Sequence, residues 1–200
     1  MYARLQTTAT RPQTDNPDKH IRRLIEVVSA HPGYAGLVLL EGEDQAGALL
    51  TLWHTREDAE LASERSRAAT GPRMMELLVD DVYEVVEDIP GRAAAEPPAV
   101  ALTGFFDGPL SPARAELARR RGQERIKPAL AQVPGLTRTL VLWHGSASKY
   151  TVVHLATSPA GLQQVTATVM SVPLAEGDDP ALLTGPDRVE THQVVAYEPA

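Results

Sequence analysis

The sequence predicts an α+β protein built from two similar halves in tandem. Two segments read alike at a spacing of 102 residues: HPGYAGLVLLEGEDQAGALLTLWHT from His31 to Thr55, and VPGLTRTLVLWHGSASKYTVVHLAT from Val133 to Thr157. Each begins with a residue before Pro-Gly, then runs through an apolar stretch, a polar turn and a second apolar stretch to a threonine. Paired apolar stretches around a polar turn predict strands, and helical periodicity flanks them. We therefore expect both halves to have the same order of elements.

Each half opens with a strand that is followed by an amphipathic helix. We expect these strands at Tyr2 to Thr8 and at Val100 to Phe106. Asn16 is a plausible N-cap for the first helix, and a proline follows it at the first helical position. Ser111 caps the corresponding helix of the second half. Pro128 is expected to kink or interrupt that helix, because proline has no backbone N–H to donate.

A hairpin, a second helix and a closing strand complete each half. The second helices are expected to begin at Thr55 and Thr157, and the sequence TRED after the first hairpin resembles a capping box. The closing strands are expected at Val82 to Glu87 and Glu190 to Tyr197. The expected hairpin strands are Leu37 to Glu41, Gly47 to His54, Thr137 to His144 and Lys149 to Leu155.

The order strand, helix, strand, strand, helix, strand is the split βαβ, or ferredoxin-like, arrangement. The segment from Ile89 to Ala99 is rich in proline, alanine and glycine, and residues 91–99 of it separate a half at 1–90 from a half at 100–200. Helices would cover one face of each sheet, and the other face is too apolar to remain exposed to water. We therefore expect the two halves to pack sheet to sheet as a pseudo-dimeric α/β barrel within one chain, with pairing into a further homodimer left open.

The composition excludes several classes of function. The 200 residues carry a net charge of −7, and no cysteine is present for disulfides, thiolate nucleophiles or metal sites. The negative charge argues against nucleic acid as a partner, and no apolar run is long enough for a membrane span. The segment MYARLQTTAT lacks the hydrophobic core of a secretion signal. We expect a cytoplasmic protein.

The stretch HPGYAGLVLLEGEDQAGALLTLWHTREDAELASE, with Pro-Gly, two hairpin strands and a tryptophan that precedes a helix, resembles the antibiotic biosynthesis monooxygenase family. This family is a branch of the dimeric α/β-barrel superfamily. The resemblance covers nearly the whole chain, because the pattern applies once to each half. It implies a cofactor-independent oxidation of aromatic polyketides, such as anthrones to quinones. No cofactor is therefore expected. The haem-degrading branch places a histidine on the second helix, and neither half has one there.

The resembling enzymes use an asparagine four residues before the tryptophan and a tyrosine six residues after it. In this chain the tryptophan is Trp53, and the two positions hold Leu49 and Ala59. At a spacing of 102, the position that matches Trp53 is Leu155. The other two positions of the second half are Thr151 and Gly161.

Small inward-facing residues and few large aromatics predict a cavity that suits a small hydrophobic or aromatic molecule. If Trp53 points into the barrel, strand alternation places Leu49 and Thr51 on the same side. The alternative is that Trp53 is a core aromatic at the strand-to-helix corner. The residues predicted to bind substrate are Trp53, Thr51, Thr151 and Tyr83.

Histidines are the natural groups for proton transfer near neutral pH in a chain without thiols. His144 and His192 are the predicted catalytic histidines, because both are expected beside a barrel cavity. Arg4, on the first strand, is predicted to stabilise an oxyanion. His154 is expected to face the helices, and His31 is interpreted as a loop residue. No histidine pair has the spacing of a metal site, so no metal is expected.

Three functions remain open from the sequence. The first is a cofactor-independent monooxygenase-like enzyme that acts on an aromatic or polyketide-type molecule. The second is a non-catalytic small-molecule-binding or stress-linked barrel, which the missing asparagine and tyrosine favour. The third is a polyketide cyclase or isomerase, which needs acid–base groups and no oxygen.

Overall fold

The computed structural model describes residues 1–9, 16–42, 46–69 and 77–199. The chain divides into two compact units, and the first is assembled from two separate segments. Unit 1 comprises Met1–Val85 and His192–Ala200, and unit 2 comprises Val86–Thr191. The predicted turn GEDQA falls partly on residues 43–45, which lie outside the described residues.

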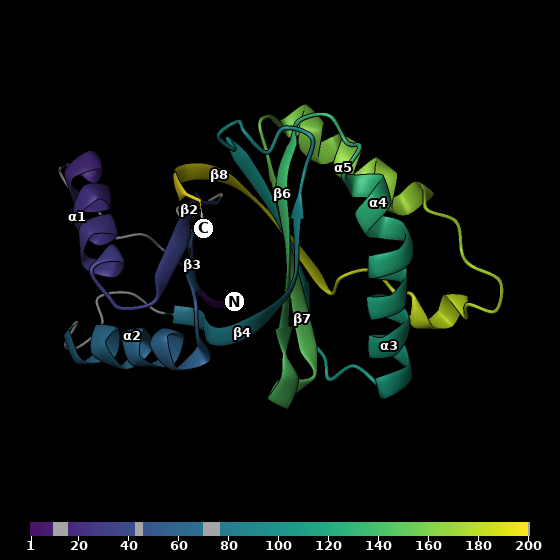
Figure 1. Ribbon diagram of the computed structural model, residues 1–200, viewed down its shortest axis with the longest axis horizontal. Coiled ribbons are helices and arrows are strands. Elements are labelled where there is room, and N and C mark those ends of the chain that lie inside the picture. The colour runs from purple at the N-terminus through teal and green to yellow at the C-terminus, as the bar shows by residue number, and fades with distance from the viewer. Residues whose placement is uncertain (10–15, 43–45, 70–76, 200) are drawn as a thin grey trace. The chain divides into compact units, whose positions relative to one another are not determined.

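The described part of unit 1 contains antiparallel strands and two helices, which follow the predicted order. The helices lie against one side of the sheet, α2 over β1 and β3 and α1 over β2 (Figure 1). Asn16 caps α1 by accepting a hydrogen bond from the Lys19 N–H at 3.0 Å, as predicted. The elements are β1 (Tyr2–Thr8), α1 (Pro17–Ser29), β2 (Tyr34–Glu41), β3 (Gly47–Trp53), α2 (Arg56–Ala69), β4 (Leu77–Pro90) and β8 (Arg188–Glu198).

The strands of unit 1 pair antiparallel in the order β4-β1-β3-β2-β8. Arg4 lies opposite Thr51 of β3 on one side and opposite Val82 of β4 on the other. Opposite residues of an antiparallel pair share a face of the sheet, so this register fixes which side chains meet. The C-terminal part of β8 pairs with β2, which is why the last residues of the chain belong to unit 1.

Unit 2 repeats the same order of elements, and its helices lie on one face of the β5-β7-β6 sheet (Figure 1). Strand β5 agrees with its predicted bounds, and Ser111 caps α3 as predicted, accepting from the Arg114 N–H at 3.2 Å. The last helix begins at Pro159, two residues later than the predicted Thr157, and Ser158 caps it. The elements are β5 (Val100–Phe106), α3 (Pro112–Arg121), a π-helical segment (Gly122–Ile126), α4 (Lys127–Leu130), β6 (Leu136–His144), β7 (Lys149–Ala156) and α5 (Pro159–Ser171).

The predicted α+β class is confirmed, and so is the ferredoxin-like α/β barrel. In the order of hydrogen-bonded neighbours, the first four strands follow β4-β1-β3-β2 and the last four follow β8-β5-β7-β6, which is the same arrangement twice. Strands β4 and β8 each run from one unit into the other. The order therefore closes on itself as β1-β3-β2-β8-β5-β7-β6-β4, a closed antiparallel barrel in its strand order.

Pro128 perturbs the helix of unit 2 without ending it. The chain continues from α3 through the π-helical segment into α4, and the Lys127 N–H bonds to the Gly122 carbonyl. A proline lacks the N–H of a helical turn, and its ring crowds the carbonyl four residues earlier. The wider π turn moves that carbonyl away, so the helix continues past the proline with a local change of register.

Candidate functional site

Trp53 lies on the helix-covered face of the unit 1 sheet and packs against α2. Its neighbours there include Ala59 and Ala62, and its side chain is 1% exposed. The indole Nε1 donates a hydrogen bond to Thr51 Oγ1 at 2.9 Å. The predicted alternation of β3 is therefore correct, but the shared face of Thr51 and Trp53 is the one under the helices. We call this side, which carries Arg4, Thr51 and Trp53, the Trp53 face.

Arg4 shares the Trp53 face because it lies directly opposite Thr51. Its Nε donates to Asp80 Oδ1 at 2.8 Å, and the side chains are 5% and 13% exposed. The terminal Nη2 is buried and has no hydrogen-bond acceptor among the described residues. A buried guanidinium donor without an acceptor is costly, so this group is suited to an oxygen atom of a ligand.

Two residues that were not among the predicted site residues border Trp53. Tyr34 meets its ring edge to face at 6.0 Å between centroids, and His31 lies at 6.4 Å. The Tyr34 hydroxyl donates to Glu198 Oε2 at 2.6 Å. Burial, followed by the bond to the Glu198 carboxylate, raises the pKa of the Tyr34 phenol well above its usual range. The phenol therefore stays protonated, and the pair ties β2 to β8 within unit 1.

Tyr83 and His192 lie on the opposite face of the unit 1 sheet. Tyr83 pairs with Ala3, one residue out of step with Arg4, and is 2% exposed. His192 lies two residues before Val194, which pairs with Leu40, and its ring approaches Gly42. Burial lowers the pKa of the His192 imidazole. Strand alternation thus separates the predicted residues of unit 1 into two groups on two faces.

The two predicted residues of unit 2 are Thr151 and His144. Thr151 is 2% exposed and lies opposite Phe105 and Leu142. His144 ends β6, and its Nδ1 accepts a hydrogen bond from the Ala147 N–H at 3.3 Å. This bond caps the short turn that leads into β7, which is a structural task for the imidazole.

His154 occupies the helix-covered face of unit 2, as predicted. It lies opposite Leu102, which packs with Leu162 of α5, and it is 8% exposed. Its Nδ1 is 2.9 Å from Thr139 Oγ1. Burial lowers the pKa of the His154 imidazole to about 4. The ring is therefore neutral near pH 7.

The hydrogen bonds of the two halves revise the spacing of the sequence repeat. Trp53 lies opposite Tyr34, and Ala156 lies opposite Leu136 in the same way. Ala156 is 103 residues after Trp53, whereas the two Pro-Gly pairs are 102 residues apart. The counterpart of Trp53 by strand register is therefore Ala156 rather than Leu155.

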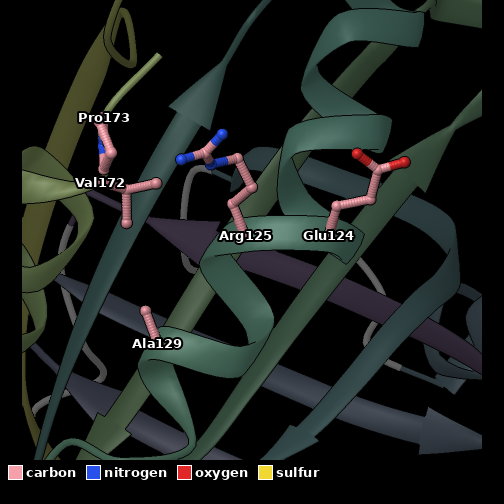
Figure 2. A pocket seen from close by; sticks show the side chains of 5 residues that line it. All are labelled: Glu124, Arg125, Ala129, Val172 and Pro173. Atoms are coloured by element: carbon pink, nitrogen blue, oxygen red, sulfur yellow. The ribbon is translucent and has the colours of Figure 1, made fainter. Parts of the chain in front are cut away.

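Unit 2 also holds two cavities, and neither contains a predicted site residue. One has a volume of about 550 Å³ and the other about 420 Å³, and Ala129 lines both. Figure 2 shows the larger one, with Glu124 and Arg125 on one side and Val172 and Pro173 on the other.

Searches for two other kinds of site were negative over the part of the chain that is described. Within those residues, no group of three or more His, Cys, Asp or Glu side chains is placed to hold a metal ion. None of the helices found there has the length and apolar character that crossing a membrane requires.

Comparison with known proteins identifies structural relatives only. Neither a protein family nor a curated protein matches the sequence. An anthrone oxidase-like protein is 18% identical, with a TM-score of 0.57 over 98% of this chain and 92% of its own. A monooxygenase-like protein from Listeria innocua is 10% identical, with a TM-score of 0.55 over 98% and 95%.

A third structure is described as a ferredoxin-fold protein related to antibiotic biosynthesis monooxygenases. It comes from Listeria monocytogenes and is 10% identical, with a TM-score of 0.53 over 97% of this chain and 95% of its own. Identities this low establish the fold alone. The chain therefore has the fold of monooxygenase-like ferredoxin-fold proteins, along nearly its whole length.

Proposed function

We propose that this protein is a monooxygenase-like enzyme that acts on a small aromatic molecule with an ionisable ring oxygen. The Trp53 face of unit 1 is the proposed site. Arg4 would bind the oxygen, and Trp53 and Thr51 lie next to it on the same face of the sheet. The fold shared with an anthrone oxidase-like protein and with monooxygenase-like proteins supports this reaction class.

The observation that carries the proposal is the buried donor of Arg4. One edge of the guanidinium is occupied by Asp80, and the buried Nη2 has no acceptor among the described residues. A negative oxygen at Nη2 would gain a charge-assisted hydrogen bond in a water-poor setting, where such bonds are strongest. Donors placed in advance toward a developing oxyanion are an efficient source of catalysis.

The reaction we propose consumes molecular oxygen and needs no organic cofactor. Loss of a proton from a ring CH₂ group gives an enolate, whose oxygen Arg4 stabilises. The enolate transfers one electron to O₂, and the resulting radical pair combines to a hydroperoxide on the same carbon. Loss of water then leaves a carbonyl, so that CH₂ and O₂ become C=O and H₂O.

Proton removal needs a base on the same face as Arg4. His192, one of the predicted bases, lies on the opposite face of the unit 1 sheet, whereas His31 lies beside Trp53. We therefore assign this step to His31, with His144 and His192 as the competing assignments. A His31→Gln variant should lower kcat by about 100-fold or more.

The test is turnover of an anthrone under air, followed by oxygen consumption and by quinone absorbance. Arg4→Gln should reduce kcat/KM by about 100-fold, and Arg4→Lys should recover part of the loss because it restores the charge. The matched control is Arg23→Gln, since Arg23 is 77% exposed on α1 and the change in charge is the same. Full turnover by Arg4→Gln would contradict the proposal, and circular dichroism would show whether the variant is folded.

A non-catalytic binding protein is the second candidate, and one observation favours it. The positions at which the resembling enzymes have asparagine and tyrosine hold Leu49 and Ala59, and Ala59 packs directly on Trp53. In this case an anthrone would quench Trp53 fluorescence in a Trp143→Phe background, with no oxygen consumed. Conversion that continues without oxygen would instead identify a cyclase or isomerase.

A further inference from the structure

A groove runs along the outer side of unit 2 between the α4 region and α5. It consists of the two cavities that share Ala129, with volumes of about 550 Å³ and 420 Å³. Both cavities are open to solvent. We call it the α4–α5 groove. The residues that line its larger cavity are Glu124, Arg125, Ala129, Val172 and Pro173.

The larger cavity is lined by both apolar and charged side chains. Ala129, Val172 and Pro173 supply apolar atoms, and the Arg125 side chain extends toward Val172 and Pro173 (Figure 2). The carboxylate of Glu124 is directed away from them (Figure 2). Arg125 is half-buried and forms no ion pair within the described part of the chain.

Three other basic residues of the α3–α4 region form ion pairs with acidic residues of unit 2. Arg119 pairs with Glu116 at 2.7 Å and Lys127 with Glu87 at 2.6 Å. Arg120 pairs with Asp178 at 2.5 Å. The chain has 26 acidic residues to 19 basic ones, so an unpaired guanidinium in a concave site is not explained by a shortage of acids. Such a group can bind an anion from outside the chain through charge-assisted hydrogen bonds.

Arg121 supplies a second, independent observation at the same end of the groove. Its Nη2 donates to the Val172 carbonyl at 2.7 Å, which fixes the end of α5 against α3. Its Nε is buried and has no hydrogen-bond acceptor among the described residues. Two arginine side chains with unused donors therefore flank Val172, and both raise the positive potential of this region.

Arg125 belongs to the π-helical segment, which covers Gly122–Ile126. The wider π turn changes the direction in which side chains leave the helix. Pro128 follows this segment in α4.

We propose that the α4–α5 groove binds a small monoanion with an apolar body, such as an aromatic carboxylate or sulfonate. Arg125 binds the anionic group, and Ala129, Val172 and Pro173 contact the apolar body. Arg121 is a positioning residue, which holds Val172 in place. This site is independent of the Trp53 face and of the activity proposed for it.

The probe for this site is 8-anilinonaphthalene-1-sulfonate, titrated into the full chain and followed by its fluorescence. We expect saturable binding that benzoate displaces. Arg125→Gln should raise the Kd by about tenfold, because a charge-assisted hydrogen bond is lost. The amide signals of Ala129 and Val172 should shift in ¹⁵N NMR spectra upon addition of benzoate.

Matched variants separate this site from general charge effects and from the proposed enzyme site. Arg119→Gln removes the same charge from a 57% exposed position and should bind the probe like the wild type. Arg4→Gln should also bind it unchanged, whatever its effect on turnover. Equal affinity in Arg125→Gln and the wild type would overturn the proposal. So would equal binding of N-phenyl-1-naphthylamine, the analogue without the sulfonate.

Discussion

At the scale of single residues, burial is the largest cause of the pKa shifts of two tyrosines, Tyr34 and Tyr150, and two histidines, His154 and His192. The clearest case is His154, whose imidazole is enclosed under α5 and reaches Thr139. Desolvation penalises its charged form, so the folded protein holds it neutral. This histidine therefore links folding stability to pH.

Acidification should destabilise the protein through His154. The pKa of its imidazole falls from the ordinary 6.5 to about 4 on folding. Between these two pH values the unfolded chain is protonated at His154 and the folded chain is not. The free energy of unfolding is therefore highest above pH 6.5 with respect to this group. It decreases as the pH falls through 4, by about 3 kcal/mol in total. Urea unfolding at several pH values should show this loss in the wild type.

A His154→Gln variant should lack that part of the pH dependence. The difference in unfolding free energy between wild type and variant should therefore shrink as the pH is lowered from 7.5 to 4. His20→Gln is the matched control, because His20 is exposed on α1. Parallel pH profiles for the wild type and His154→Gln would show that His154 is not the group responsible.

Some properties of the candidate site could be predicted from the sequence, and others could not. Strand alternation correctly grouped Thr51 with Trp53. Which face of the sheet they occupy depends on the packing of α2, where Ala59 and Ala62 leave room for the indole. The contact of His31 with Trp53 depends on where the loop before β2 is placed, and no sequence pattern marks that position.

At the scale of elements, the helices differ in how much they contribute to the core. Helix α5 buries Gly161, Leu162 and Val165, whereas α1 has no fully buried residue. Both begin with a side-chain cap, at Ser158 and at Asn16. Loss of a cap should therefore have a global effect in one helix and a local effect in the other.

Ser158→Ala should lower the free energy of unfolding by about 1 kcal/mol, because the Gly161 N–H loses its acceptor. Asn16→Ala should change global unfolding less and should speed amide exchange within α1. Chemical denaturation and hydrogen exchange measure the two effects. A larger global loss for Asn16→Ala than for Ser158→Ala would contradict this ranking.

Helix caps and apolar runs made most elements predictable, and β1 and β5 agree with their predicted bounds. Strand β4 is much longer than the predicted Val82 to Glu87, because Asp80 and Asp81 interrupt the apolar pattern of its first half. The Asp80 carboxylate is accommodated by pairing with Arg4. The π turn was also missed, since the sequence shows the proline but not how the helix adapts to it.

At the scale of the whole molecule, sequence order and compact units do not coincide. The sequence predicts halves at 1–90 and 100–200, whereas unit 1 also includes the residues from His192 onward. The reason is the pairing of β8 with β2, from Leu37 opposite Glu198 to Glu41 opposite Gln193. The linker rich in proline, alanine and glycine marks where the chain passes from the first half to the second. Its sequence does not indicate which strands pair.

A fragment of residues 1–90 should therefore be less stable than unit 1 within the full chain. Its β2 edge would be unpaired, and exposed strand edges promote association. We expect the fragment to self-associate in size-exclusion chromatography and a synthetic peptide of residues 192–199 to restore a monomeric species. A scrambled peptide is the control. A stable monomeric fragment that does not bind the peptide would instead support the predicted boundary.

The pairing of β2 with β8 also has a consequence for synthesis on the ribosome. About 150 residues separate Glu41 from its partner Gln193. At the usual 5–20 residues per second, synthesis of the partner strand follows that of β2 by roughly 8–30 s. During that interval the nascent chain presents an open edge with Val38 and Leu40 on it. Chaperones that hold extended segments during translation are therefore expected to engage this protein at β2.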